Sequence, residues 1–139
     1  MLVAKKTKKT DFDKVVEMLQ DISDFMPNKF NSDEIWNQFS GQNNVFAYSF
    51  FNEEKLVGYG SFIIETKIRG GKVAHIEDIV VDDAHRGKGF GSIIMNFLNT
   101  KAKENKCYKS SLSCKNHNIS FYENCGFKKS GNTMNFFIK

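Results

Sequence analysis

Hydrophobic and polar positions alternate along the chain with two different periods, and each period predicts one type of secondary structure. Alternation at every second position is typical of a β-strand, and spacing of three to four positions is typical of a helix. Period-two segments dominate the middle of the chain, where three of them follow one another with short turns between. Strands are predicted over residues 2–7, 45–51, 56–65, 73–81, 108–114, 127–130 and 134–138.

Helical spacing appears in four further segments. Thr10 and Ser32 are suitable N-cap residues for the first two, and Pro27 ends the first. Gly126 follows the last segment at the position where a helix often ends in a left-handed residue. The helices are predicted over residues 11–26, 33–40, 89–105 and 118–124.

The composition fits one folded domain. The chain has 139 residues, 40% of them hydrophobic and one of them proline, so a single domain over residues 1–139 is expected. No apolar run is long enough to cross a membrane, and no apolar signal segment precedes the first lysines. We therefore expect a cytoplasmic protein whose cysteines Cys107, Cys114 and Cys125 are reduced and buried, without a metal site.

The net charge of +4 raises the question of a nucleic-acid partner, since basic proteins attract polyanions. Only one cluster of lysines is present, formed by Lys5, Lys6, Lys8 and Lys9. It flanks the first predicted strand, where lysines protect a sheet edge from pairing with other chains. We therefore interpret the cluster as a solvated edge and expect no nucleic-acid partner.

A glycine-rich, basic loop joins the strand that ends at Val81 to the long helix. Asp82 and Asp83 favour a turn, and three glycines then alternate with other residues up to position 91. A helix start leaves backbone N–H groups without partners and carries a partial positive charge, so such a loop can bind phosphate. The alternative is a tight strand-to-helix turn with incidental charges. The spacing fits neither the dinucleotide fingerprint nor the mononucleotide P-loop.

Arg86-x-x-Gly89-x-Gly91 resembles the pyrophosphate loop of the GNAT superfamily of acyl-CoA-dependent N-acetyltransferases. The resemblance continues in three other blocks, at residues 75–81, 107–109 and 118–127. Together these blocks are similar to those of the glucosamine 6-phosphate N-acetyltransferases. The resemblance implies an α/β (α+β) GNAT fold, with a mixed central sheet flanked by helices. It also implies that the strands on either side of the long helix splay apart.

The resemblance further implies where acetyl-CoA binds and that no metal is needed. The pantetheine arm would lie in the gap between the splayed strands, bonded to their free backbone groups. Tyr122 would lie beside the sulfur of acetyl-CoA. The residues implied to bind acetyl-CoA are Ile79, Val80, Val81, Arg86, Gly87, Lys88, Gly89, Phe90, Gly91, Ser92, Asn116 and Tyr122.

Acetyl transfer needs a neutral amine and a stabilised leaving thiolate. The resemblance places Glu77 and Asp78 beside the amine, and we expect only one of them to point into the cleft because they alternate on a strand. Tyr122 is the candidate proton donor to the thiolate. The alternatives are a carboxylate that pairs with a lysine on the sheet and a core tyrosine. We expect His75 to have a structural role.

Tyr108 and Lys109 are the candidate substrate-binding residues on the strand after the long helix. Two departures from the family pattern leave the acceptor amine open. Ser113 stands where the family has a carboxylate, and only Lys139 is near the position of a C-terminal arginine. A polyamine, an amino acid or a protein lysine is an alternative acceptor, and an acyl-CoA-binding regulator is an alternative to an enzyme. The resemblance also implies a homodimer, and the apolar residues 136–138 are consistent with burial in it.

Overall fold

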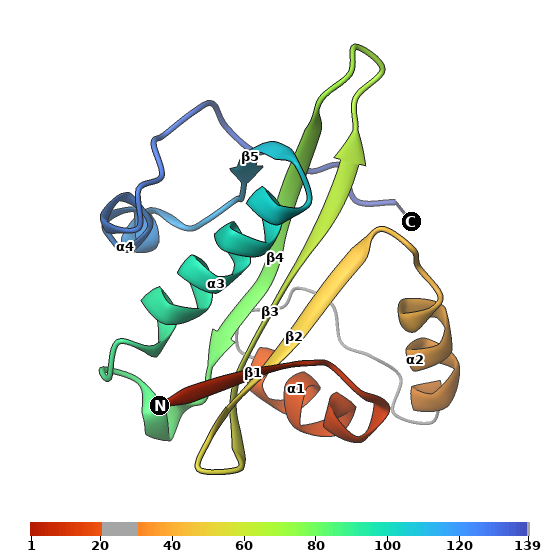
Figure 1. Ribbon diagram of the computed structural model, residues 1–139, viewed down its shortest axis with the longest axis vertical. Coiled ribbons are helices and arrows are strands. Elements are labelled where there is room, and N and C mark those ends of the chain that lie inside the picture. The colour runs from red at the N-terminus through yellow and green to blue at the C-terminus, as the bar shows by residue number, and fades with distance from the viewer. Residues whose placement is uncertain (21–30, 139) are drawn as a thin grey trace.

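The computed structural model describes residues 1–20 and 31–138 of this chain. Strands and helices follow one another in the predicted order as far as α4 (Ile119–Asn124), and helices lie on both sides of one sheet (Figure 1). The predicted end of the first helix, at Pro27, lies outside the described residues. The elements are β1 Leu2–Lys6, α1 Phe12–Leu19, α2 Ser32–Ser40, β2 Val45–Asn52, β3 Lys55–Thr66, β4 Lys72–Val81, α3 Phe90–Glu104, β5 Cys107–Ser111 and α4 Ile119–Asn124, with 3-10 turns at Lys9–Asp11, Asp83–His85 and Asn116–Asn118.

The sheet is mixed, and its strands lie in chain order from β1 to β5. The first four strands pair antiparallel, and β5 pairs parallel to β4. That parallel pairing extends only from Lys72 to His75 on β4. Beyond His75 the two strands separate, as the resemblance implied. The prediction that β5 continues to residue 114 is wrong because β4 no longer offers it a partner.

Two hydrophobic clusters hold the helices to the two faces of the sheet. On one face, Ile94 and Leu98 of α3 are fully buried against Phe62. On the other face, Val15 and Met18 of α1 pack with residues of β2, β3 and β4. No helix among the described residues is both long and apolar enough to span a membrane.

The first two helices begin one residue away from the predicted caps. Asp11, not Thr10, is the N-cap residue of α1. Its carboxylate accepts hydrogen bonds from the Lys8 N–H (2.9 Å) and the Ser49 hydroxyl (3.1 Å), which hold the 3-10 turn that precedes the helix. Asn31 is the N-cap residue of α2, so Ser32 is already helical.

The two strands predicted at the C-terminus do not form. Residues 127–138 contain no regular secondary structure and pair with no described strand. A strand needs a partner edge and a surface that covers its apolar side chains, and this segment pairs with no strand in the described part of the chain. The exposed side chains are Met134, Phe136, Phe137 and Ile138, with 92%, 86%, 68% and 87% of their surface accessible.

Candidate active site

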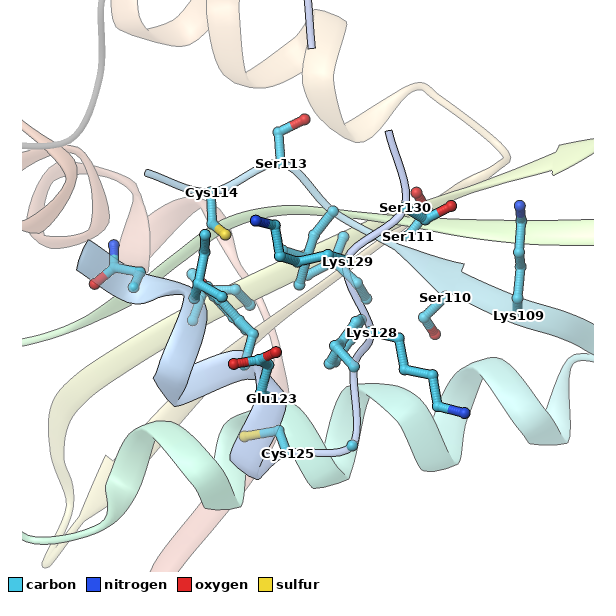
Figure 2. Close-up of a pocket in the computed structure, with 18 of the residues that line it drawn as sticks. Lys109, Ser110, Ser111, Ser113, Cys114, Glu123, Cys125, Lys128, Lys129 and Ser130 are labelled. Atoms are coloured by element: carbon cyan, nitrogen blue, oxygen red, sulfur yellow. The ribbon is translucent and has the colours of Figure 1, made fainter. Parts of the chain in front are cut away.

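An open cleft of about 1460 Å³ lies where β4 and β5 separate. Its walls come from β4, the second half of α3, β5, α4 and the segment 125–133 (Figure 2). Seven of the residues selected from the sequence lie in these walls. They are Glu77, Asp78, Ile79, Tyr108, Lys109, Asn116 and Tyr122.

A β-bulge in β4 shapes the floor of the cleft. Asp78 has a left-handed backbone with φ of 55°, and the pairing with β3 shifts register between Tyr59 and Ser61. The hydroxyl of Ser61 donates a hydrogen bond of 3.0 Å to the carbonyl of Glu77 and so holds the bulge. Gly60 lies opposite, where a Cβ would approach Ile79 Cδ1 to 2.8 Å.

The bulge overturns the expectation that only one of two adjacent carboxylates faces the cleft. A bulge places two residues opposite one and breaks the regular alternation of side chains. Both Glu77 and Asp78 therefore line the cleft. A left-handed backbone at a non-glycine residue costs roughly 1–3 kcal/mol and tends to occur at functional sites.

The cleft opens to both faces of the sheet. Figure 2 shows the side chains of Lys109 and Ser113 pointing away from α3, whereas Ser110 and Lys128 point toward it. Directly paired residues have their side chains on the same face of a sheet, and the register pairs Lys109 with Val73. Val73 lies four positions before Glu77 on β4, so the side chains of Lys109 and Glu77 lie on the same face. We call this surface the acceptor face, formed by Glu77, Lys109, Ser111 and Ser113.

The pKa of the Glu77 carboxyl is raised from its ordinary value of 4.5. Desolvation by the cleft wall is the main cause, and the negative charge of Asp78 adds to it. His75 acts in the opposite direction, because a positive charge favours the carboxylate. A carboxylate whose pKa is raised is a better proton acceptor than an ordinary one.

Tyr122 of α4 lies on the other side of the cleft. Its ring contacts Phe121 and Phe127, with centroids 5.0 and 5.9 Å away. Burial raises the pKa of its phenol, and the nearby thiols Cys114 and Cys125 contribute in the same direction. The phenol hydroxyl forms no hydrogen bond with any residue in the described part of the chain, so its proton is available to a ligand.

The glycine-rich loop lies beside the cleft and does not line it. Gly87 and Gly89 have left-handed backbones, with φ of 81° and 79°, while Gly91 makes room for the ring of Phe121, which a Cβ would approach to 3.0 Å. No described residue accepts a hydrogen bond from the backbone N–H groups of residues 87–92. The loop therefore presents a row of free donors at the start of α3, as predicted for phosphate binding.

The two cations of the loop differ in their surroundings. Arg86 pairs with Asp83 (2.7 Å), and its Nε donates a hydrogen bond of 3.2 Å to the Val81 carbonyl. Lys88 forms no ion pair with the described residues. Val80 is buried against α1, so its side chain cannot reach a ligand in the cleft.

Several residues of the cleft were not selected from the sequence. Lys128 and Lys129 come from the segment predicted as a strand, and Asn99 of α3 places a buried Oδ1 atom without a described donor at the wall. The sequence feature that could have identified Asn99 is its polar side chain next to Leu98 on the apolar face of the helix. The segment carrying the lysines is held by a 2.6 Å hydrogen bond between the hydroxyls of Ser113 and Thr133.

All three cysteines are free, but the expectation that they are buried is wrong. Cys114 is exposed, and Cys107 and Cys125 are half-buried. The open cleft explains this difference, because all three side chains lie around it.

Comparisons with known proteins show which family the chain resembles. Residues 15–127 match the model of the acetyltransferase (GNAT) family. The glucosamine 6-phosphate N-acetyltransferase of Candida albicans is 33% identical over 94% of this chain and 91% of its own length. Glucosamine 6-phosphate N-acetyltransferase 1 of Dictyostelium discoideum is 36% identical over 92% of this chain and 85% of its own.

A solved structure extends the similarity to the fold. The crystal structure of glucosamine-6-phosphate N-acetyltransferase from Arabidopsis thaliana superimposes with a TM-score of 0.86 at 29% identity, covering 100% of this chain and 99% of that one. The α/β fold with a mixed sheet expected from the resemblance is therefore confirmed. The family model and the curated relatives each cover most of the chain, and this protein belongs to the GNAT acetyltransferase family.

Proposed function

We propose that this protein transfers the acetyl group of acetyl-CoA to the amine of glucosamine 6-phosphate. The observation that carries the proposal is its similarity to glucosamine 6-phosphate N-acetyltransferases over more than nine-tenths of the chain. The charges of the cleft support it: the walls contain Glu77, Asp78 and Glu123 against five lysines. An acceptor with both an amine and a phosphate suits such a mixed, net positive surface.

The residues around the cleft fit acetyl-CoA on one side. The free N–H groups of residues 87–92 and the ammonium of Lys88 suit its diphosphate. Beyond His75, the edge of β4 that faces β5 has no strand partner among the described residues. The backbone of Ile79 can therefore form hydrogen bonds with the pantetheine amides along this edge, as a neighbouring strand would. Asn116, at the start of a 3-10 turn in the cleft wall, is placed to hold the same arm. Acetyl-CoA supplies an activated thioester when it is bound.

The acceptor face suits the sugar. Glu77, with Asp78 beside it, receives the proton that the attacking amine releases, and Lys109 neutralises the phosphate. Tyr122 donates its proton to the departing thiolate from the opposite side. Tyr108 is 60% exposed beside Lys109, where its ring can cover the sugar.

The apolar C-terminal residues Met134, Phe136, Phe137 and Ile138 support assembly of two copies. Contiguous exposed apolar side chains mark interaction sites, and unpaired extended backbone can add to a neighbouring sheet. We infer a homodimer in which this segment packs on the second copy. Light scattering of the full chain should give twice the monomer mass, and Phe136→Glu with Phe137→Glu should give the monomer mass.

A thiol-release assay with acetyl-CoA tests the activity. Glucosamine 6-phosphate should be turned over with a higher kcat/KM than glucosamine, because only the phosphate reaches Lys109. Turnover of spermidine or lysine peptides alone would contradict the proposed acceptor while leaving acetyl transfer in place. Tight acetyl-CoA binding without turnover of any amine would contradict the enzymatic function.

A further inference from the structure

Ser61 of β3 contacts the bulge of β4 from outside the cleft. Its side chain is buried, with 4% of its surface exposed, and it is not among the residues that line the cleft. Its hydroxyl donates the hydrogen bond of 3.0 Å to the Glu77 carbonyl. A buried hydrogen bond of this kind is not readily exchanged for one with water, because losing it would leave both groups unpaired. The direction of the Glu77 carbonyl is therefore fixed.

That carbonyl belongs to the peptide group that joins Glu77 to Asp78. Because a peptide group is planar, the direction of the Glu77 carbonyl also sets the direction of the Asp78 N–H, and with it the backbone torsion φ at Asp78. This torsion is the left-handed one, with φ of 55°. A left-handed backbone costs free energy at a non-glycine residue and persists only where the surrounding structure favours it. The hydrogen bond from Ser61 is such a contact.

The register requires a bulge at this point but leaves its shape open. Ser61 pairs with Glu77, and Tyr59 pairs with Val80. One residue therefore lies between the paired positions on β3 and two lie between them on β4, which is the pattern of a bulge. The pairs on either side hold the ends of the bulge in place. The hydroxyl of Ser61 acts between those ends, where the backbone leaves the regular ladder.

Gly60 gives the bulge room on the α3 face of the sheet. A Cβ atom at this position would approach Ile79 Cδ1 to 2.8 Å and Leu98 Cδ1 to 2.9 Å. The missing side chain therefore lets Ile79 lie over β3 and against the core. The two neighbours of Gly60 thus have separate tasks, since Tyr59 packs with α1 and Ser61 bonds the bulge.

The phenol of Tyr59 lies near the same polar groups. Burial raises the pKa of Tyr59 to about 12, the Ser61 hydroxyl opposes the rise, and the charge of Asp78 adds to it. Tyr59 is therefore protonated through the neutral range and places no second negative charge near Asp78.

We propose that Ser61 is a positioning residue for acetyl transfer: its hydrogen bond orients the peptide between Glu77 and Asp78 and so presents both carboxylates to the acceptor amine. The proposal rests on the proposed function, which assigns the amine proton to Glu77. In that reaction the amine nitrogen bonds to the acetyl carbon, the carbon–sulfur bond breaks, Glu77 takes a proton from nitrogen and the thiolate takes one from Tyr122. Ser61 touches none of these atoms and acts through Glu77.

The test compares two buried serines. Ser49 of β2 is fully buried, and its hydroxyl forms hydrogen bonds with Thr7 (2.9 Å) and Asp11 (3.1 Å), outside the cleft. Ser61→Ala should lower kcat for glucosamine 6-phosphate about tenfold, because catalysis is sensitive to small displacements of the reacting groups. Its Kd for acetyl-CoA should stay within about twofold of wild type, since the loop at residues 87–92 is untouched. Ser49→Ala should lose at least as much thermal stability and keep the wild-type kcat.

Rescue by a conservative change separates the hydroxyl from simple packing. Ser61→Thr keeps the hydroxyl and adds a methyl group that a strand accommodates well, so it should retain most of the wild-type kcat. A wild-type kcat in Ser61→Ala, an equal fall in Ser49→Ala or an equal fall in Ser61→Thr would overturn the proposal. If Ser61→Ala does not fold, as judged by circular dichroism, Ser61→Cys against Ser49→Cys decides, because a thiol is similar in size and a weaker donor.

A crystal structure of Ser61→Ala examines the bulge without any amine. We expect the peptide between Glu77 and Asp78 to rotate and the Glu77 carboxylate to move. A moved carboxylate in a protein that does not acetylate glucosamine 6-phosphate would support the role of Ser61 and contradict the proposed acceptor. An unmoved bulge and a wild-type kcat in an active enzyme would contradict the role of Ser61 and leave the proposed activity intact.

Discussion

The glycine-rich loop and the acceptor face lie on either end of β4 but are built in different ways. The loop is one contiguous segment, residues 82–92, whose free N–H groups follow from local backbone conformation at Gly87 and Gly89. The acceptor face is assembled from β3, β4 and β5, so its geometry depends on register and on the bulge at Asp78. The difference teaches that local conformation suffices for an anion-binding loop, while acceptor recognition needs the assembled sheet.

The largest effect is expected at Tyr122, in the wall of the cleft. Tyr122→Phe removes the phenolic proton but keeps the ring contacts with Phe121 and Phe127. We expect kcat to fall about 10²-fold, as for loss of a general acid, with an unchanged Kd for acetyl-CoA. Steady-state kinetics and calorimetry measure the two quantities. Tyr48→Phe, whose ring packs against Phe97 outside the cleft, is the control, and an unchanged kcat in Tyr122→Phe would remove this residue from the chemistry.

The loop can be broken by a single methyl group. Gly89→Ala forces a side chain onto a left-handed residue, which costs roughly 1–2 kcal/mol, and displaces the first N–H groups of α3. We expect the Kd for acetyl-CoA to rise about tenfold. Gly70→Ala is matched, since its φ is 85° and its surroundings are equally open, and Gly70 lies in the turn between β3 and β4, outside the cleft. It should lose similar stability in a thermal melt yet bind acetyl-CoA normally; equal affinities in the two variants would contradict the loop's role.

The acceptor face can be tested by removing one charge. Lys109→Ala should raise the KM for glucosamine 6-phosphate about fivefold, because it removes one charge-assisted contact. The KM for unphosphorylated glucosamine should not change. Lys128→Ala removes a cleft lysine that points toward α3 in Figure 2 and should leave both KM values unchanged. A matching rise in the Lys128 variant would mean that the two faces are not distinct.

The smallest expected effect is a shift in pH dependence. The active form needs Glu77 deprotonated and Tyr122 protonated. Because the pKa of Glu77 is raised, kcat should rise with pH through a midpoint above 4.5. Because the pKa of Tyr122 is also raised, kcat should stay high until pH exceeds 10.0. A kcat profile against pH checks both limbs, and Glu77→Gln should abolish the acidic one; a persisting acidic limb would place the proton acceptor elsewhere.

The sequence by itself predicted the order of elements as far as α4, the glycine-rich loop and the candidate residues of β4. These features are local: period-two and helical spacing, and glycines at the start of α3. The resemblance of four short blocks to the GNAT family added the proposed role of Tyr122, and family membership is confirmed. The sequence could not predict the bulge at Asp78, because a bulge is set by pairing with Gly60 and Ser61 on another strand.

Only the tertiary structure decided which distant residues share the cleft and which predicted strands exist. Residues 134–138 have a strand-like pattern but pair with no described strand, so pattern alone misled. Lys128 gains its position in the cleft from chain topology, and the hydrogen bond from Ser61 to Glu77 depends on register. The physical reason is that secondary structure follows from neighbouring residues, whereas a site that joins separated strands follows from how their edges pair.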